Sequence, residues 1–151
     1  MNEMIEIQDA SNMDSLPAKK MLTEWVEKAL QKQYQDAEIT LRIVDEVEGL
    51  SLNKRWRKKK SATNVLSFPV GEILEQAPNF LGDIVICAPV VEREANEQGK
   101  TFDAHWAHLI IHGVLHLQGY DHKSDERANI MESKEILILE EIGYTNPYKT
   151  K

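Results

Sequence analysis

The five histidines of the chain lie close together and include a pair at helical spacing. All five fall within eighteen residues, at His105, His108, His112, His116 and His122. In a helix, His112 and His116 would lie one turn apart, with their Cβ atoms about 6 Å from each other. Two imidazoles at that spacing can bind one metal ion through bonds of about 2.0–2.1 Å. The pair therefore predicts part of a metal site.

A third ligand can come from the turn that follows this helix. Gly119 can adopt the left-handed conformation that redirects the chain after a helix C-terminus. His122 follows three residues later, and three residues span at most about 10 Å, enough to return to the same ion. Three nitrogen ligands and an open fourth position are typical of catalytic zinc. We expect one zinc ion per chain, and nickel or another divalent transition metal also suits imidazole ligands.

The remaining histidines, His105 and His108, are interpreted more simply as packed side chains. His108 and His112 are also one turn apart, so they form a rival ligand pair. Because no turn delivers a third ligand to that pair, we rank it below the site formed by His112, His116 and His122.

The ligand spacing matches that of the metzincin proteases, H-E-x-x-H-x-x-G-x-x-H. In those enzymes the glutamate is the general base. Gly113 occupies its position here and cannot accept a proton, so the sequence disfavours peptide hydrolysis. Phosphodiester cleavage remains open, because zinc lowers the pKa of a bound water toward about 7 and can neutralise charge on a phosphoryl oxygen. Such a reaction would gain from a second cation near its anionic transition state.

The second chemical feature is a cluster of positive charge on an acidic chain. The sequence contains 18 Lys and Arg against 25 Asp and Glu, which gives a net charge of −7. Six of the 18 basic residues lie within seven positions: Lys54, Arg55, Arg57, Lys58, Lys59 and Lys60. A cationic patch on an anionic body steers polyanionic partners toward one place. The alternative is a solvated helix face, in which Trp56 packs into the core rather than stacking on a base.

Hydrophobic periodicity predicts the elements that must position these residues. A buried helix from His105 to Gln118 carries the histidine pair. Four more helices are expected, at Ser15 to about Tyr34, Leu50 to about Lys59, Pro89 to Gly99 and Ser124 to Gly143. Strands are expected at Met4–Gln8, Glu38–Asp45, Asn64–Val70 and Leu81–Ala88, with a loop at Gly71–Phe80. About four strands and about five helices in mixed order predict an α+β fold with a small mixed sheet.

Length and composition favour one domain that comprises residues 1–151. Apolar residues make up 42% and charged residues 28%, which is ordinary for a globular protein. No apolar run approaches the ~18 residues of a membrane span, and the first ten residues lack the basic start of a signal peptide. Cys87, the single cysteine, is expected to be buried and inert. We therefore expect a cytoplasmic protein with no membrane partner.

Several separate blocks of the sequence resemble one known family. The segment HGVLHLQGYDH at 112–122 resembles the signature of the YbeY-type bacterial endoribonucleases. Leu52-Asn53 followed by Arg57 resembles the L-N-x-x-x-R of that family, and TNVLSFP at 63–69 resembles its T-[DN]-V-L-S-F-P. LGDI at 81–84 and Gly143-Tyr144 also match in register. The resemblance covers roughly residues 52–148.

This resemblance implies a metal-dependent endoribonuclease that prefers single-stranded RNA. It implies action on precursor ribosomal RNA, especially at the 3′ end of the small-subunit RNA, and a role in ribosome quality control. It implies zinc ligation by His112, His116 and His122, and identifies Arg57 as the arginine of the active cleft. The small ribosomal subunit and an Era-type GTPase are the partners that it implies.

These arguments assign roles to individual residues. We expect Arg57 and His116 to be catalytic, with Arg57 offering its guanidinium fork to a phosphate. Further candidate substrate contacts are Lys58 and Lys59. Asp83 and Asp121 could accept a hydrogen bond from a metal-bound imidazole, although Asp121 could equally be a turn residue. Asn64 and Ser67 could line the cleft or satisfy the backbone.

Two other functions remain open on the sequence alone. A zinc metalloprotease would have the ligand spacing but not the general base. A non-catalytic ribosome assembly factor would use zinc to stiffen the fold and the basic segment to bind RNA. The sequence also leaves open whether water or the 2′-hydroxyl of RNA attacks.

Overall fold

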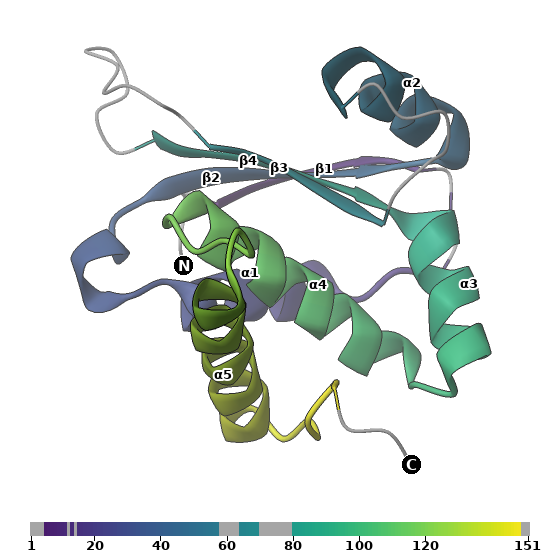
Figure 1. Ribbon diagram of the computed structural model, residues 1–151. Coiled ribbons are helices and arrows are strands. Elements are labelled where there is room, and N and C mark those ends of the chain that lie inside the picture. Colours follow the sequence, from purple (N-terminus) through teal and green to yellow (C-terminus); the bar gives the residue numbers. More distant parts are fainter. Residues whose placement is uncertain (1–4, 12, 14, 58–63, 70–79, 149–151) are drawn as a thin grey trace.

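The computed structural model describes residues 5–11, 13, 15–57, 64–69 and 80–148, with the backbone alone at 56 and 57. These residues form one four-stranded sheet and a set of helices on its faces (Figure 1). The expected Gly71–Phe80 loop lies almost entirely outside the described residues, as do Lys58 to Lys60 of the basic segment.

The sheet is mixed, as predicted. Its strands are β1 (Ile5–Ala10), β2 (Glu38–Val44), β3 (Val65–Pro69) and β4 (Phe80–Cys87). They lie in the order β1-β2-β4-β3, with β1 and β4 parallel to β2 and β3 antiparallel to β4. β3 is thus at one edge of the sheet, beside the central strand β4.

The alternation of the strands gives the sheet two different faces. On β2, Ile39, Leu41 and Ile43 are buried against the helical layer, and Leu41 pairs with Ile84 of β4. Val44, at the end of β2, joins a smaller apolar cluster on the other face, which also contains Val85 and Cys87 of β4. Because side chains alternate along a strand, Asp83 shares this second face with Val85.

The helices are α1 (Lys19–Ala29), α2 (Glu46–Arg57), α3 (Ala88–Gln98), α4 (Phe102–Leu117) and α5 (Asp125–Glu141), with a short 3₁₀ turn η1 (Lys32–Tyr34). In Figure 1, α1 and α4 lie below the sheet with α5 beneath them, while α2 lies above it. The α+β class with about four strands and about five helices is therefore confirmed.

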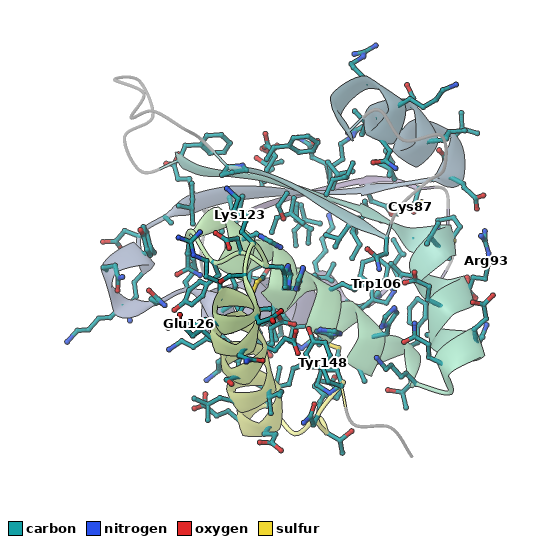
Figure 2. All side chains as sticks on the ribbon, in the orientation of Figure 1. Cys87, Arg93, Trp106, Lys123, Glu126 and Tyr148 are labelled. Atoms are coloured by element: carbon teal, nitrogen blue, oxygen red, sulfur yellow. The ribbon has the colours of Figure 1, made fainter. Side chains whose placement is uncertain are left out.

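The centre of the molecule is α4. It packs against α1, α3, α5, β3 and β4. Side chains all around it are fully buried, including Trp106, Ile110, Ile111 and Leu115, and Figure 2 shows Trp106 within the helical layer. The predicted buried helix that carries the histidines is therefore confirmed.

Several boundaries differ from the predicted ones. α1 ends at Ala29 rather than near Tyr34, because the side-chain amide of Gln118 forms hydrogen bonds with the backbone groups there. Gln118 Nε2 donates to the carbonyl of Ala29 at 2.7 Å, and its Oε1 accepts from the amide of Gln31 at 2.8 Å. A side chain from the end of α4 thus stops α1.

Two helices begin earlier than predicted because of capping residues. α2 begins at Glu46, since the carboxylate of Asp45 accepts from the amide of Glu48 at 2.9 Å. α4 begins at Phe102, since the Thr101 hydroxyl accepts from the amide of Ala104 at 3.2 Å. Both are short polar side chains of the kind that cap helix N-termini.

The helix at the C-terminal end follows its prediction closely. The Ser124 hydroxyl accepts from the amide of Arg127 at 3.1 Å and so caps α5.

Cys87 is buried, as expected, and burial raises the pKa of its thiol. Within the part of the chain that the structure describes, no helix combines the length and the apolar character that a membrane crossing requires.

Candidate metal centre

α4 presents two histidines at its C-terminal end. His112 and His116 are one turn apart on this helix, and their ring centroids lie 4.6 Å from each other. Both rings are half-buried at the bottom of a cleft. The packing of α4 between the sheet and α5 fixes the direction in which the two rings point.

The turn after α4 delivers the third histidine. Gly119 has a φ of 104°, which favours glycine. The amides of Gly119 and Tyr120 donate back to the carbonyls of His116 at 3.0 Å and Leu115 at 3.1 Å. These bonds close the helix and send the chain back over it, so that His122 meets the other two rings.

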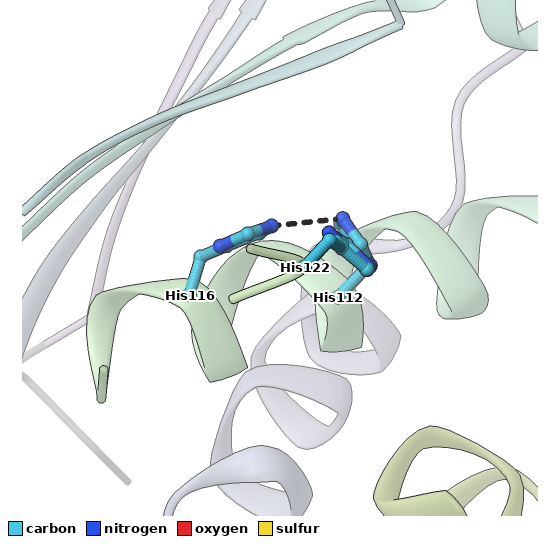
Figure 3. Close-up of side chains that lie close together, drawn as sticks. All are labelled: His112, His116 and His122. Carbon is cyan, nitrogen blue, oxygen red and sulfur yellow. Dashed lines mark hydrogen bonds between the residues drawn. The ribbon is translucent and has the colours of Figure 1, made fainter. Parts of the chain in front are cut away.

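The three rings converge on one point (Figure 3). His116 Nε2 lies 3.1 Å from His112 Nε2. The ring of His122 stacks on that of His112 at a centroid distance of 5.0 Å and meets that of His116 at 5.2 Å. The nitrogen atoms that the three offer lie within 4.8 Å of one another. The structure thus brings together the three residues that the sequence predicts as ligands.

This donor set fits a metal ion. Two nitrogens bound to one tetrahedral ion at about 2.0–2.1 Å would lie about 3.3 Å apart, close to the observed separation of the two Nε2 atoms. Burial, together with the charges of His112 and His122, lowers the pKa of His116 to about 4. The ring of His116 is therefore neutral near pH 7, which is the form that binds metals.

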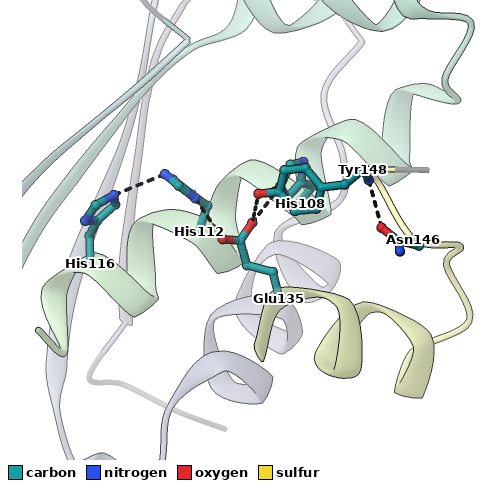
Figure 4. A network of polar contacts seen from close by, with 6 residues as sticks. All are labelled: His108, His112, His116, Glu135, Asn146 and Tyr148. Atoms are coloured by element: carbon teal, nitrogen blue, oxygen red, sulfur yellow. Dashed lines mark hydrogen bonds and ion pairs between the residues drawn. The ribbon is translucent and has the colours of Figure 1, made fainter. Parts of the chain in front are cut away.

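A residue that the sequence analysis missed, Glu135, supports this cluster. It comes from α5 and its side chain is fully buried. Its Oε2 lies 3.1 Å from His112 Nδ1, and its Oε1 lies 2.7 Å from His108 Nε2 (Figure 4). Burial alone would raise the pKa of Glu135, but the hydrogen bonds from His108, His112 and Tyr148 outweigh it and lower the pKa to about 2.

The sequence did contain a signal for Glu135. It lies four residues after Met131 and three before Ile138, both of which are buried on the inner face of α5. A glutamate on an apolar helix face is rarely buried without a partner. A charged residue at a core position of α5 therefore indicated a donor on a neighbouring helix.

The histidine cluster opens into a cleft of about 680 Å³. The far side of the cleft is β3, with Ser67 on the sheet face that packs on α4; the Ser67 hydroxyl donates to the carbonyl of Gly113 at 3.3 Å. The lining residues are Asn53, Val65, Leu66, Ser67, Pro69, His112, His116, Asp121, His122 and Lys123. Lys123, which the sequence analysis did not single out, adds a positive charge beside His122 (Figure 2).

Gly113 lies where α4 packs closely against the sheet. A Cβ at this position would lie 3.2 Å from the Ser67 hydroxyl and 3.3 Å from two carbons of Ile84. The position that carries the general base in metzincins therefore faces packed side chains of the sheet rather than an open space. The structure gives a packing reason for the glycine and offers no place there for a glutamate.

The two predicted aspartates lie in different places. Asp121 lines the cleft, but its carboxylate accepts from the Lys123 amide at 2.9 Å and pairs with Arg127 at 3.3 Å, as a turn residue does. Asp83 does not reach the cluster, because it is on the opposite face of the sheet. Burial raises the pKa of its carboxyl, against a hydrogen bond from Thr40.

The rival pair, His108 and His112, has a candidate third partner that does not come from a turn. His108, His112 and Glu135 place their candidate ligand atoms within 4.8 Å of one another, and Glu135 is on α5. His105 is packed, as expected, and its Nε2 lies 3.0 Å from Glu94 Oε1.

Asn64 and the basic segment are placed only in part. Asn64 does not line the cleft; its amide donates to Glu94 Oε1 at 3.0 Å. Arg57 is the last residue of α2, and its side chain, like that of Trp56, is outside the described structure. Lys58 and Lys59 are also outside the described residues.

Known sequences show the same pattern over nearly the whole chain. The sequence model of one family, described as Endoribonuclease YbeY, matches residues 4–143, which include all three histidines of the cluster. The chain belongs to the YbeY endoribonuclease family. The resemblance seen in the separate motifs is thereby confirmed.

Individual members of the YbeY family are similar over nearly their full lengths. An Endoribonuclease YbeY of Pseudomonas syringae pv. syringae is 53% identical over 146 residues, which cover 95% of this chain and 87% of that protein. One from Stutzerimonas stutzeri is 53% identical over 148 residues, or 96% and 92% of the two chains. A solution structure from Thermotoga maritima has a TM-score of 0.62 and 28% identity, and covers 95% of this chain and 99% of that one.

Proposed function

We propose that this protein is a zinc-dependent endoribonuclease that cleaves single-stranded RNA, with His112, His116 and His122 as the zinc ligands. The observation that carries the proposal is the convergence of three imidazole rings at the base of an open cleft. Membership in a family whose relatives are named endoribonucleases supports the choice of RNA. A protein ligand that closes the fourth position is not found among the described residues of the cluster.

A bound divalent ion would supply charge neutralisation at a phosphoryl oxygen and a water of lowered pKa. The residues of the chain would hold the ion, orient its ligands and bind the RNA. The carboxylate of Glu135 accepts from His112 Nδ1 and so leaves the Nε2 lone pair for the ion. Lys123 places a positive charge at the cleft for the phosphate backbone. His116 is proposed as catalytic through its place in the ligand set.

Arg57 is proposed to bind the phosphate at which cleavage occurs. Its support is its place on α2: Asn53 lines the cleft, and Arg57 is one turn further along the same helix face. A guanidinium fork can donate two parallel hydrogen bonds to a phosphate. Lys58 and Lys59 follow in the sequence and are proposed as further backbone contacts.

The finer biological role rests on the family resemblance. We propose that the substrate is precursor ribosomal RNA, with the 3′ end of the small-subunit RNA as the preferred region, and that cleavage serves ribosome quality control. The small ribosomal subunit and an Era-type GTPase are the proposed partners, and the cytoplasm is the proposed compartment.

The test is a cleavage assay with zinc-loaded protein and a single-stranded RNA. We expect the His116→Ala variant to lose cleavage and to bind less zinc, because the ion loses one of its three ligands. His105→Gln is the matched control: it also removes a histidine from α4, but His105 contacts Glu94 rather than the cluster. Equal cleavage by wild type and His116→Ala would reject the assignment.

The same assay separates the alternatives. RNA binding without turnover would support a non-catalytic assembly factor, and chelator-sensitive cleavage of peptides would support a metalloprotease. Arg57→Ala is expected to abolish RNA cleavage while the zinc content stays that of the wild type. Loss of zinc from this variant would contradict a role in binding phosphate.

A further inference from the structure

The chain returns to the metal centre after α5 ends. The hydroxyl of Tyr148 lies 2.6 Å from Glu135 Oε1 and 3.1 Å from His108 Nε2 (Figure 4). The Tyr148 ring meets the His108 ring edge-on at 5.2 Å. The Asn146 side chain accepts from the amide of Tyr148 at 2.8 Å and fixes the turn that aims the ring inward. The last described residue thus contacts the network behind the histidine cluster.

The carboxylate of Glu135 has its two oxygens assigned to different partners. Oε1 accepts from Tyr148 and faces His108 Nε2, while Oε2 faces His112 Nδ1. Among the described residues, His108 Nδ1 has no hydrogen-bond partner, so the ring proton of His108 belongs on Nε2, toward the carboxylate. A buried carboxylate is stable only when donors surround it, and here three of them do.

This arrangement fixes the proton of His112. With Oε1 held by Tyr148 and His108, Oε2 is left to accept from His112 Nδ1. A proton on Nδ1 leaves the lone pair on Nε2, the atom that faces His116 Nε2 at 3.1 Å. The tautomer that offers Nε2 to the cluster is therefore set by the carboxylate on the opposite side of the ring.

We infer that Tyr148 is a positioning residue of the metal centre, acting through Glu135 to hold His112 in the tautomer and orientation that offer Nε2 to the ion. The inference rests on the proposed zinc site. It makes Tyr148, which lies beyond residues 4–143 that match the family's sequence model, a component of that site. Groups that orient a metal-bound histidine typically contribute 10–100-fold to metal affinity.

The first experiment compares two tyrosine-to-phenylalanine variants of the full chain. Tyr148→Phe removes the hydroxyl from Glu135, whereas Tyr144→Phe removes one from a ring that packs on Trp25. Zinc affinity is measured by competition with a chromophoric chelator, without RNA. We expect Tyr148→Phe to bind zinc about 10-fold more weakly than wild type and Tyr144→Phe to bind it equally well. If Tyr148→Phe bound zinc as tightly as wild type and Tyr144→Phe do, the inference would be overturned.

A second readout reports the tautomer directly. In metal-free protein, ¹⁵N NMR of the imidazole rings is expected to show His112 protonated on Nδ1, with a smaller Nδ1–H fraction in Tyr148→Phe. A purely structural role would leave this signature unchanged. A wild-type His112 protonated on Nε2 would also overturn the inference.

Glu135→Gln provides an independent variant. Its amide can donate to Nδ1 and so favours the wrong tautomer, and we expect a zinc affinity at least 10-fold lower; Glu140→Gln, exposed on the same helix, is the control. Because Glu135 is buried, the Glu135→Gln variant can fail to fold. The test then rests on Tyr148→Phe, because Tyr148 is 41% exposed and its replacement disturbs the core less.

The outcomes separate this inference from the proposed function. Wild-type protein that binds no zinc would reject the proposed site and the inference with it. Wild-type protein that binds zinc, with variants that bind it equally, would reject the inference alone. A second zinc ion bound by His108, His112 and Glu135 would also reject it, because Glu135 would then be a ligand rather than an acceptor for His112.

Discussion

Burial lowers the pKa of two histidines on α4, His105 and His116, and of these only His116 belongs to the histidine cluster. His105 lies between α3 and α4, with its Nε2 3.0 Å from Glu94 Oε1. Burial lowers the pKa of His105 below the ordinary value of 6.5, and the Glu94 carboxylate opposes that shift only in part. His105 lies more than one turn from the ligands, so its titration can be studied separately.

We expect His105 to make the stability of the protein depend on pH. Below about pH 6.5 the unfolded chain takes up a proton on His105 that the folded protein does not, so the free energy of unfolding decreases as the pH falls from 6.5 toward the folded pKa. The measurement is urea denaturation at pH 7.5 and 5.5, with chelator present, for wild type and His105→Gln. The wild type should lose more stability than the variant between these pH values.

The other titrating groups are present in both proteins, so the difference isolates His105. A loss of stability equal in wild type and His105→Gln would show that His105 has the same pKa in the folded and unfolded states.

At the scale of whole elements, the ends of α1 and α4 depend on each other. The Gln118 side chain satisfies the carbonyl of Ala29 and the amide of Gln31. It lies at the start of the turn that carries His122. The side-chain amide of Gln118 thus connects the ends of α1 and α4, next to the histidine cluster.

Gln118→Ala is expected to destabilise the protein by about 1–3 kcal/mol, because it leaves two partly buried backbone groups without partners. Urea denaturation measures this loss. Gln98→Ala, at the exposed end of α3, is the control and should change stability by less than about 0.5 kcal/mol. If the two variants unfolded at the same urea concentration, the end of α1 would not depend on Gln118.

At the scale of the whole molecule, the cleft lies between the edge of the sheet and the end of α4. The chain is acidic overall, with a net charge of −7, yet six of its 18 basic residues lie at 54–60. This segment begins on α2, which also contributes Asn53 to the cleft. The charge distribution therefore favours approach of a polyanion to this part of the surface.

We expect RNA binding to weaken with salt, and the dependence to be smaller in a Lys58→Gln/Lys59→Gln double variant. Each phosphate contact to single-stranded RNA contributes about 0.7 to the slope of log affinity against log salt. Loss of two contacts should therefore reduce the slope by about 1.4. Fluorescence anisotropy of a labelled RNA, in a His116→Ala background that prevents cleavage, measures the slope.

The control for this measurement is Lys19→Gln/Lys20→Gln, which removes the same charge from an exposed position at the start of α1. Equal slopes for the two double variants would mean that Lys58 and Lys59 contribute only to the net charge.

The sequence alone was sufficient for features that depend on neighbours in the chain. The one-turn spacing of His112 and His116 and the turn at Gly119 follow from local helix geometry, which is why the sequence predicts that the three rings meet. The mixed sheet and the α+β fold class also follow from strand and helix periodicity. The capping signals at Asp45 and Thr101 are in the sequence as well, and they place the starts of α2 and α4 earlier than the apolar periodicity does.

Only the tertiary structure decided the features that depend on which elements pack together. Glu135 contacts His112 from 23 residues away in the chain through the packing of α5, and Tyr148, in the segment after α5, contacts Glu135. Asp83 faces away from the cluster, and alternation along a strand cannot say which face of the sheet meets α4. A local pattern fixes the spacing of side chains, but the packing of the elements fixes their directions, and a metal site needs both.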